Sequence, residues 1–344
     1  MTKQQKIKNL IISLIFIMIF SLFGVFYANI NLKINNSLAN NFNFVSVKNS
    51  LMVHFVSVGQ GDAVAINLPD DKIMLIDCGP ESCNTNYTQY LQDTVLNTKR
   101  DKVIDYLVLT HSDLDHIGGA LRLLQNFAVK TIFMPVMVEE TDFYLEFKSI
   151  VDAKNYNQIQ IENGLNLSTN NYKIDFYVSD LATEENDLCP IIKLNYLNKT
   201  FLFTGDISSA VETEMVNKIG NTLDCDVLKV AHHGSKYSTS MDFLTHTTPQ
   251  FAVISCGQNS YGHPTAEVVN NLQSCGANIL RTDISGNIAF VVNNQLNLKV
   301  LSGSIKTTGM YLDIRILIVV LDCVILINGI TLFLRKSKKK KHAR

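Results

Sequence analysis

Along the middle of the chain, short apolar runs rich in β-branched and aromatic residues alternate with polar turns and with segments of helical period. Gly, Asn, Asp and Pro punctuate these runs, as in Gly59-Gln60-Gly61-Asp62. The apolar runs predict strands at Met52–Val58, Ala63–Asn67, Ile73–Asp77, Tyr106–Leu109, Thr131–Met134, Tyr172–Val178, Ile191–Tyr196, Thr200–Phe203, Val227–Val230, Phe251–Ile254, Asn278–Leu280, Ile288–Val292 and Leu296–Leu301. The helical periods predict helices at Thr88–Asn97, Gly118–Asn126, Ser208–Ile219 and Ala266–Gln273.

The stretch from Glu139 to Asn171 is polar and has no clear period, so it predicts no regular element. Elsewhere strands and helices alternate with no repeat and no internal linker. This order predicts one α/β domain over residues 51–301.

Two segments of 19 residues, 10–28 and 316–334, are apolar enough to cross a membrane as helices. The first carries no charge, is longer than the apolar core of a typical signal peptide, and ends at the poor cleavage site Phe26-Tyr27-Ala28. The second contains Asp322, whose insertion cost the surrounding Ile, Leu and Val can outweigh. The alternatives are a cleaved signal peptide and a buried C-terminal helix.

Basic residues flank the outer end of each apolar segment, and such flanks stay on the cytosolic side. Residues 1–9 contain three lysines, and residues 335–344 contain seven Lys and Arg. We therefore expect a two-pass protein of the cell membrane with both tails in the cytosol. Linkers at 29–50 and 302–315 would join the two spans to a domain facing outside.

The net charge of −1 conceals a segregation of charge. Without the basic ends, the middle of the chain has 19 basic and 29 acidic residues, a balance of about −10. Such an acidic body does not fit a protein that coats nucleic acid. The seven cysteines do not form a disulfide framework, and those in the domain are expected to be small buried side chains. One or two disulfides are the alternative for a domain outside the cytosol.

The strongest chemical signal is His111-Ser112-Asp113-Leu114-Asp115-His116, directly after an apolar strand and before Gly118-Gly119. Four side chains that can bind metals occur within six residues. An irregular connection after a strand lets alternate side chains converge on one ion. A chance group of solvated polar residues is the alternative.

Three further strand ends carry weaker signals. Asp206, in Thr204-Gly205-Asp206, could bridge two ions through its two oxygens, or could cap the following helix. His232 and His233 follow another apolar strand, and one of them could be a core or surface residue. His263, between Gly262 and Pro264, could meet an anionic substrate or lie in an exposed turn.

Together these motifs, with Val56–Ala63 and Leu75–Gly79, resemble the metallo-β-lactamase fold of the hydrolase domain in the ComEC competence family. Their order and spacing match over residues 51–301. The resemblance implies an αββα sandwich, here flanked by two transmembrane helices, with a metal centre at one edge of its two sheets. It also implies hydrolysis, with phosphodiester bonds as the expected target.

The resemblance also implies roles for individual residues. His111 and Asp113 would bind one ion, Asp115 and His116 the second, and Asp206 would bridge them. His233 would complete the ligand set and leave His232 as proton donor, because successive side chains leaving a strand point to opposite faces. The remaining assignments are Asp115 as a catalytic ligand, His263 in catalysis and substrate binding, Ser235 in substrate binding, and Asp62 and Asp77 as residues that orient the ligands.

The chain departs from the family pattern in two respects. No histidine lies between His116 and His232, where many relatives have a further ligand. Cys189 lies near that place, and its thiolate is an alternative ligand for zinc. The many-helix membrane channel of the competence proteins is also missing from this pattern. A DNA-transport channel is therefore not expected.

The sequence thus predicts a hydrolase with two divalent ions, Zn²⁺ or Mn²⁺, that attacks phosphodiesters through metal-activated hydroxide. Three carboxylates among the ligands keep Mn²⁺ in competition with Zn²⁺. The expected partners are a phosphodiester substrate, either DNA or a cell-envelope polymer, and the lipid membrane, with no stable protein partner. The alternative is a catalytically degenerate domain that only binds metal or a partner at the membrane.

Overall fold

The computed structural model describes residues 50–96, 101–138, 141–293 and 298–302. They belong to one compact unit, residues 44–303, whereas the second unit consists of residues 1–43 and 304–344. The two predicted membrane segments, 10–28 and 316–334, and the two basic tails lie outside the described residues. Within the described ranges, every helix is too short or too polar to cross a bilayer.

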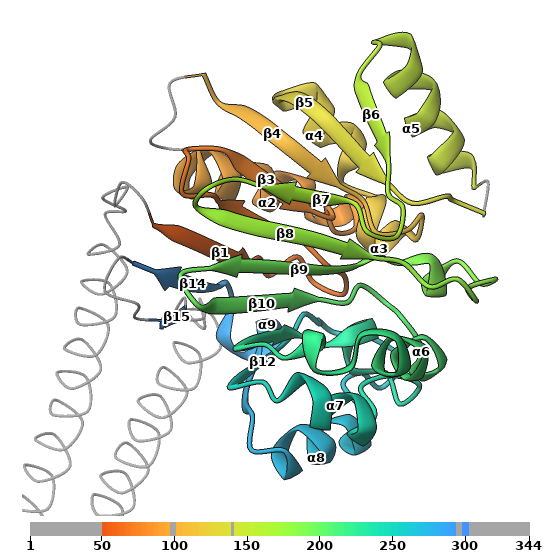
Figure 1. Cartoon of the computed structure of the whole chain (residues 1–344). Coiled ribbons are helices and arrows are strands. Elements are labelled where there is room, and N and C mark those ends of the chain that lie inside the picture. Colours follow the sequence, from red (N-terminus) through yellow and green to blue (C-terminus); the bar gives the residue numbers. More distant parts are fainter. Residues whose placement is uncertain (1–49, 97–100, 139–140, 294–297, 303–344) are drawn as a thin grey trace, which may run out of the picture. The chain divides into compact units, whose positions relative to one another are not determined.

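Two β-sheets lie at the centre of the described unit (Figure 1). The first has eight strands in the order β15-β14-β1-β2-β3-β4-β5-β6. Its strands are β1 Leu51–Phe55, β2 Val64–Asn67, β3 Ile73–Ile76, β4 Val103–Val108, β5 Ala128–Met134, β6 Asn157–Gln160, β14 Ile288–Val292 and β15 Leu298–Ser302. Strands β3 to β6 are parallel, and the other neighbours are antiparallel.

The second sheet has seven strands in the order β13-β12-β11-β10-β9-β8-β7. Its strands are β7 Asn166–Ser168, β8 Tyr172–Tyr177, β9 Ile191–Tyr196, β10 Lys199–Phe203, β11 Val227–Lys229, β12 Phe251–Ile254 and β13 Asn278–Arg281. Strands β10 to β13 are parallel. Each sheet therefore has a parallel half whose carboxyl ends share one edge.

Alternation along the strands divides the apolar side chains among three layers. Leu51, Val53 and Phe55 of β1 pack with Phe201 and Phe203 of β10 in a core between the sheets. The other faces of the two sheets pack under helices on opposite sides, in two further cores. This arrangement of helix, sheet, sheet and helix is the predicted αββα sandwich.

The helices cover the outer faces of the sheets (Figure 1). Those against the first sheet are α2 Asn84–Tyr90, η2 Leu91–Val95, α4 Ala120–Asn126 and α5 Asp142–Ala153. Those against the second are α6 Ser209–Ile219, α7 Met241–Thr247 and α8 Ala266–Ser274. Shorter helical segments are η1 Glu81–Cys83, α3 Leu114–Ile117, η3 Asn186–Leu188, η4 Gly220–Leu223, η5 Ala231–Gly234 and α9 Thr282–Ser285.

Several predicted elements need correction. The polar stretch from Glu139 to Asn171 contains α5, β6 and β7. Strands β6 and β7 are sheet edges with partly exposed residues, so they lack the apolar alternation that identifies a half-buried strand. The helix predicted at Gly118–Asn126 is α4, which begins at Ala120, and the one-turn helix α3 before it was not predicted. The helix predicted at Thr88–Asn97 begins at Asn84. Helix α7 was not predicted, because only three of its seven residues are buried.

Candidate metal centre

Side chains able to bind metal gather where parallel strands of both sheets end. Strand β3 leads to Asp77, β4 to His111 and α3, and β10 to Asp206. Strand β11 leads to η5, which contains His232 and His233. The parallel pairing of these strands aligns their ends, so residues from distant parts of the sequence converge at one edge.

His116 is buried and held by Asp77. Its Nδ1–H donates to Asp77 Oδ2 at 2.8 Å. Asp77 also accepts hydrogen bonds from the backbone N–H and the hydroxyl of Thr110, at 2.8 and 2.7 Å. A carboxylate that binds the Nδ1–H of a histidine fixes the tautomer and leaves the Nε2 lone pair free for a metal.

His111 and His233 are oriented in the same way. The Thr110 hydroxyl proton is used for Asp77, so Thr110 Oγ1 accepts from His111 Nδ1–H at 3.0 Å. His233 Nδ1–H donates to the carbonyl of Ser255 at 2.9 Å. His111 Nε2 is buried without a hydrogen-bond partner. All three imidazoles therefore direct an Nε2 lone pair into the same region.

The distances among these donor atoms fit one divalent ion. His116 Nε2 lies 3.3 Å from His233 Nε2 and 3.4 Å from Asp206 Oδ1. His233 Nε2 lies 3.2 Å from Asp115 Oδ2 and 3.3 Å from Asp206 Oδ2. Ligand atoms about 2.0–2.1 Å from a tetrahedral ion are about 3.3 Å apart, so these separations suit a shared metal.

A second pair of donors adjoins this group. His111 Nε2 lies 3.4 Å from Asp113 Oδ2, and the His111 ring centroid is 4.1 Å from that of His116. Cys189 Sγ lies 3.3 Å from His111 Nδ1, which is the protonated side of that ring. Burial, and then the charge of Asp206, raise the pKa of the Cys189 thiol. The structure therefore places Cys189 behind His111 as a neutral thiol.

The carboxylates dominate the protonation of the clustered histidines. Burial lowers the pKa of His116 and His233, but the negative charge of Asp206 and its neighbours outweighs it, and both pKa values are raised well above 6.5. Burial raises the pKa of Asp206, and the positive charges of the same histidines bring it well below its usual range. A cluster that attracts protons this strongly also attracts divalent cations.

Asp62 lies in the same cluster but on another side of the histidines. Asp62, His116, Asp206 and His233 have possible ligand atoms within 4.8 Å of one another. The imidazole atoms nearest to Asp62 are the Nδ1 atoms, at 3.5 Å in His233 and 4.0 Å in His116. Asp62 is thus on the side of these rings that is already hydrogen-bonded, and its Oδ2 pairs with the ammonium of Lys229.

A cleft of about 710 Å³ opens over the cluster. It is lined by Gln60, Pro80, Glu81, Asp113, Leu114, Asp115, Asp206, His232, His233, Gln258, Asn259, Ser260, Tyr261 and His263. His232 Nε2 is 3.9 Å from Asp206 Oδ2, and the His232 and His263 rings lie edge to face at 5.6 Å. Burial lowers the pKa of both His232 and His263, which favours their neutral forms.

Ser235 is not among the residues that line this cleft. It is 2% exposed, its backbone N–H donates to the His232 carbonyl, and its hydroxyl accepts from the Tyr237 N–H at 3.4 Å. The structure thus gives Ser235 a place inside the turn that carries the histidines. The predicted contact between Ser235 and substrate finds no support in this placement.

Sequence reasoning missed four residues that organise the site. Thr110 links Asp77 to His111, and Lys229 pairs with Asp62. Glu185 accepts from the Ser112 N–H and hydroxyl, at 3.0 and 2.6 Å. The Asn259 side chain binds both the N–H and the carbonyl of His263, at 3.0 and 2.8 Å. Of these four residues, only Lys229 stands out in the sequence, as a lysine within an apolar run.

Comparisons with known proteins relate this part of the chain to one protein family. Residues 56–142 match the model of the metallo-beta-lactamase superfamily. ComE operon protein 3 of Bacillus subtilis is 31% identical over 270 residues, which are 71% of this chain and 33% of that protein. Competence protein ComA of Neisseria gonorrhoeae is 30% identical over 198 residues, 57% of this chain and 26% of that protein.

Among solved structures, the metallo-beta-lactamase fold protein YhfI from Bacillus subtilis aligns with a TM-score of 0.47 and 12% identity. The alignment covers 70% of this chain and 99% of that one. The chain spans about a third or less of the length of the two curated relatives, 33% and 26%.

Proposed function

Because the chain carries a metallo-β-lactamase domain related to the competence proteins, we propose that this domain is a metal-dependent phosphodiesterase. The observation that carries the proposal is the convergence of the Nε2 atoms of His116 and His233 on Asp206, which lines the cleft, with His111 oriented beside them against Asp113. A domain that had lost its chemistry would have little reason to keep the orienting partners of all three rings.

The donor set divides into two ion sites. His116, Asp115 and His233 would hold one ion, His111 and Asp113 the other, and Asp206 would serve both. Ions bound there would act as Lewis acids on the attacking water and on the phosphoryl oxygens. The protein orients the ligands through Asp77, Thr110 and the Ser255 carbonyl.

His232 and His263 lie on the cleft wall, where they can exchange a proton with a bound substrate. His232 is the closer of the two to the cluster, at 3.9 Å from Asp206. Burial lowers the pKa of His232, so this ring must first take up a proton from water, and the negative charge of Asp206 favours that uptake. We assign it the transfer of a proton to the leaving oxygen.

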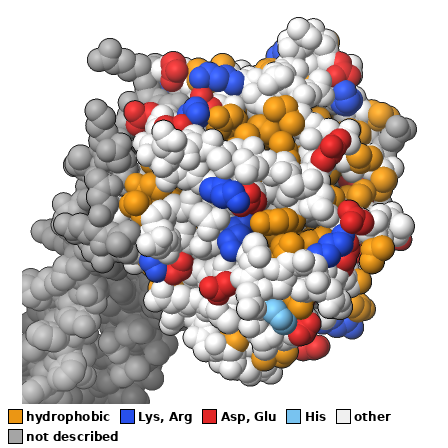
Figure 2. Space-filling view, in the orientation of Figure 1, with side chains coloured by type: hydrophobic (Ala, Val, Ile, Leu, Met, Phe, Trp, Pro, Cys, Tyr) orange, Lys and Arg blue, Asp and Glu red, His pale blue; other side chains and the backbone are white. Residues whose placement is uncertain are grey.

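The charge of the cleft bears on the substrate. Four of its lining residues are acidic, namely Glu81, Asp113, Asp115 and Asp206, and the lining contains neither lysine nor arginine. On the face shown in Figure 2, basic and acidic side chains are interspersed without a continuous basic track. This charge favours a substrate with few phosphates, such as a short DNA strand or one linkage of an envelope polymer.

Hydrolysis assays with defined substrates test the proposal. Bis-p-nitrophenyl phosphate, p-nitrophenyl phosphorylcholine, single-stranded DNA and a lactam would each be incubated with the protein and Mn²⁺ or Zn²⁺. We expect metal-dependent cleavage of at least one phosphodiester and none of the lactam. Uptake of two ions per chain without cleavage of any phosphodiester would favour the alternative function of metal or partner binding.

We also propose that residues 10–28 and 316–334 anchor this domain outside the cytosol as membrane helices. The support is their apolar composition and the lysines and arginines beside them. An outward domain would meet envelope polymers or incoming DNA directly.

A further inference from the structure

Lys229 occupies a position where the strand pattern requires an apolar side chain. It is the last residue of β11, two positions after Val227, which packs in the core between the sheets. In the register of the second sheet it lies between Phe203 and Val253, two other residues of that core. Lys229 is only 2% exposed, so its ammonium is enclosed with the inter-sheet core.

The ammonium reaches the back of the metal centre. It pairs with Asp62 Oδ2, lies 3.9 Å from Asp206 Oδ1, and donates to the Gly205 carbonyl at 3.4 Å. Burial lowers the pKa of Lys229, but the charges of Asp62 and then Asp206 outweigh it and raise that pKa. A charged group this deeply buried persists only when such partners compensate it.

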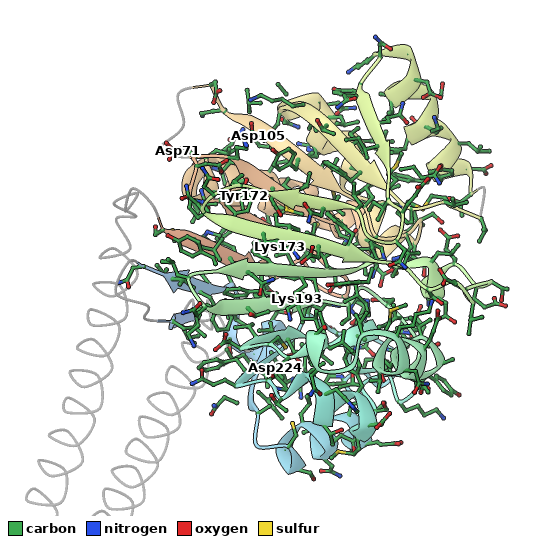
Figure 3. The ribbon with its side chains drawn as sticks, in the orientation of Figure 1. Asp71, Asp105, Tyr172, Lys173, Lys193 and Asp224 are labelled. Carbon is green, nitrogen blue, oxygen red and sulfur yellow. The ribbon has the colours of Figure 1, made fainter. Side chains whose placement is uncertain are left out.

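A second buried lysine shows that this arrangement is specific to the site. Lys193 on β9 is 9% exposed, and its Nζ donates to the backbone carbonyls of Thr222 and Asp224 (Figure 3). Neither partner belongs to the metal centre. Lys193 therefore donates hydrogen bonds to the carbonyls of a loop, whereas Lys229 neutralises carboxylates.

The position of Asp62 explains what the charge of Lys229 achieves. An anionic oxygen so close to three ligands would compete for the metal if nothing held it. Asp62 instead faces Lys229 and the Nδ1 side of His116 and His233, away from the Nε2 lone pairs.

We propose that Lys229 is the internal counter-charge of the metal centre: it holds Asp62 out of the ligand set and offsets the charge of Asp206 while leaving that residue free to bind. Lys229 is thus a positioning residue that sets how tightly the site holds divalent ions. This inference rests on the proposed metal centre, and it assigns Asp62 to Lys229 and not to an ion.

A double-mutant cycle tests the inference with Mn²⁺ alone. The full-length protein and its Lys229→Met, Asp62→Asn and Asp62→Asn/Lys229→Met variants would be freed of metal. Thermal unfolding would then be followed by circular dichroism and Mn²⁺ binding by calorimetry. Lys193→Met is the control, because it removes a buried ammonium that does not contact the cluster.

The two single variants should change Mn²⁺ affinity in opposite directions. Lys229→Met leaves Asp62 unpaired and the site more negative, so Mn²⁺ should bind about 10-fold or more tightly. Asp62→Asn leaves the ammonium unpaired, so Mn²⁺ should bind about 10-fold or more weakly. Both should unfold at lower temperature without metal, because each leaves a buried charge without its partner.

The double variant shows whether Asp62 is the partner of Lys229 or a metal ligand, because it removes both charges together. We expect it to fold, to unfold near the wild-type temperature, and to bind the wild-type number of Mn²⁺ ions within about 3-fold of wild-type affinity. If Lys229→Met does not fold but the double variant does, the pairing is supported. A double variant that does not fold, or that binds Mn²⁺ as weakly as Asp62→Asn, would overturn the inference and make Asp62 a ligand.

Failure of the proposed function would look different, because the wild-type protein itself would then take up no Mn²⁺ or Zn²⁺. A change in Mn²⁺ affinity for Lys193→Met as large as that for Lys229→Met would also count against the inference, because the effect would then belong to any buried lysine.

Discussion

At the scale of single residues, each metal-facing imidazole is fixed through its other nitrogen. His111, His116 and His233 donate Nδ1–H to a hydroxyl, a carboxylate and a carbonyl, respectively. Three different acceptors produce the same outcome, an Nε2 lone pair beside a carboxylate, which is Asp206 for His116 and His233 and Asp113 for His111. The site therefore depends on partners that no metal-ligand motif includes.

Replacing Asp115 by Ala should remove a ligand without loosening the core, because its side chain is one-third exposed and lies on the one-turn helix α3. Activity should fall by about 100-fold or more with loss of an ion, since both ions are needed to stabilise the attacking and leaving oxygens. Metal analysis and phosphodiester hydrolysis would measure this. Glu81→Ala is the control, because Glu81 is an acidic residue of the same cleft that has no contact with the clustered histidines. More than a tenth of the wild-type rate in excess metal would exclude Asp115 as a ligand.

The adjacent histidines should differ in what their loss removes. His233→Ala should lose one ion per chain, and His232→Ala should keep its ions. The His232 variant should lose about 10²–10⁴-fold on substrates with poor leaving groups, and far less on p-nitrophenyl esters, whose leaving group needs no proton. Equal metal loss in both variants would remove His232 as proton donor and direct attention to His263.

The pH dependence of metal binding follows from the raised pKa values of His116 and His233. In the metal-free protein these rings keep their protons to a higher pH than usual, and a metal must displace those protons. Affinity for Mn²⁺ should therefore rise between pH 6 and pH 8. Calorimetry in two buffers of different ionisation enthalpy would count the protons released. Equal affinity and no proton release over this range would contradict the assignment of these rings as ligands.

The sequence predicts that the side chains of His232 and His233 point in different directions. They do, but alternation along an extended strand is the wrong reason. Extended alternation does not apply, because β11 ends at Lys229 and both histidines have left-handed backbones, with φ of 49° and 53°. Gly234 follows with φ of 83°, and a side chain there would meet Pro264. The tight turn directs His233 into the cluster and His232 to the cleft wall. A motif reveals the residue types, and the turn that orients them depends on packing from distant segments.

At the scale of elements, the strands were predictable wherever both faces are buried or alternate. Ile191–Tyr196, Phe251–Ile254 and Ile288–Val292 match the predicted bounds, because their apolar residues pack against a core or an outer helix layer. Edge strands such as β6 lack that signal. The acidic partner Glu185 was equally hidden, since it lies 73 residues from Ser112 in the sequence.

Glu185 lies in the connection between β8 and β9 and contacts the connections that follow β4 and β5. Its replacement tests whether these contacts position the loop that carries His111. One carboxylate oxygen accepts from Ser112, and the other accepts from the Val138 N–H at 2.9 Å. Glu185→Ala should weaken Mn²⁺ binding at His111 and Asp113 by about 10–100-fold, the usual effect of losing an orienting partner. The exposed neighbour Glu184 provides the control variant Glu184→Ala. Lower stability with unchanged Mn²⁺ affinity would reduce Glu185 to a structural residue.

At the scale of the whole molecule, the two sheets supply the site jointly. Asp77, His111 and His116 follow strands of the first sheet, and Asp206 and His233 follow strands of the second. Each sheet alone provides an incomplete ligand set. The candidate ligand set is therefore complete only when the two halves of the sandwich pack together.

Membrane topology is the remaining prediction, and it rests on where the charges lie along the chain. Basic residues at 3–8 and 335–344 should stay in the cytosol, and the acidic middle should cross to the outside. In intact cells, tags at the two ends of the protein should then resist external protease, while the middle of the chain is digested. A soluble reporter protein would confirm that the cells are intact. Digestion of the C-terminal tag would exclude the second span, because Lys338 to Lys341 would then lie outside. Protection of the whole chain would instead place the domain in the cytosol and restrict its substrates to those found there.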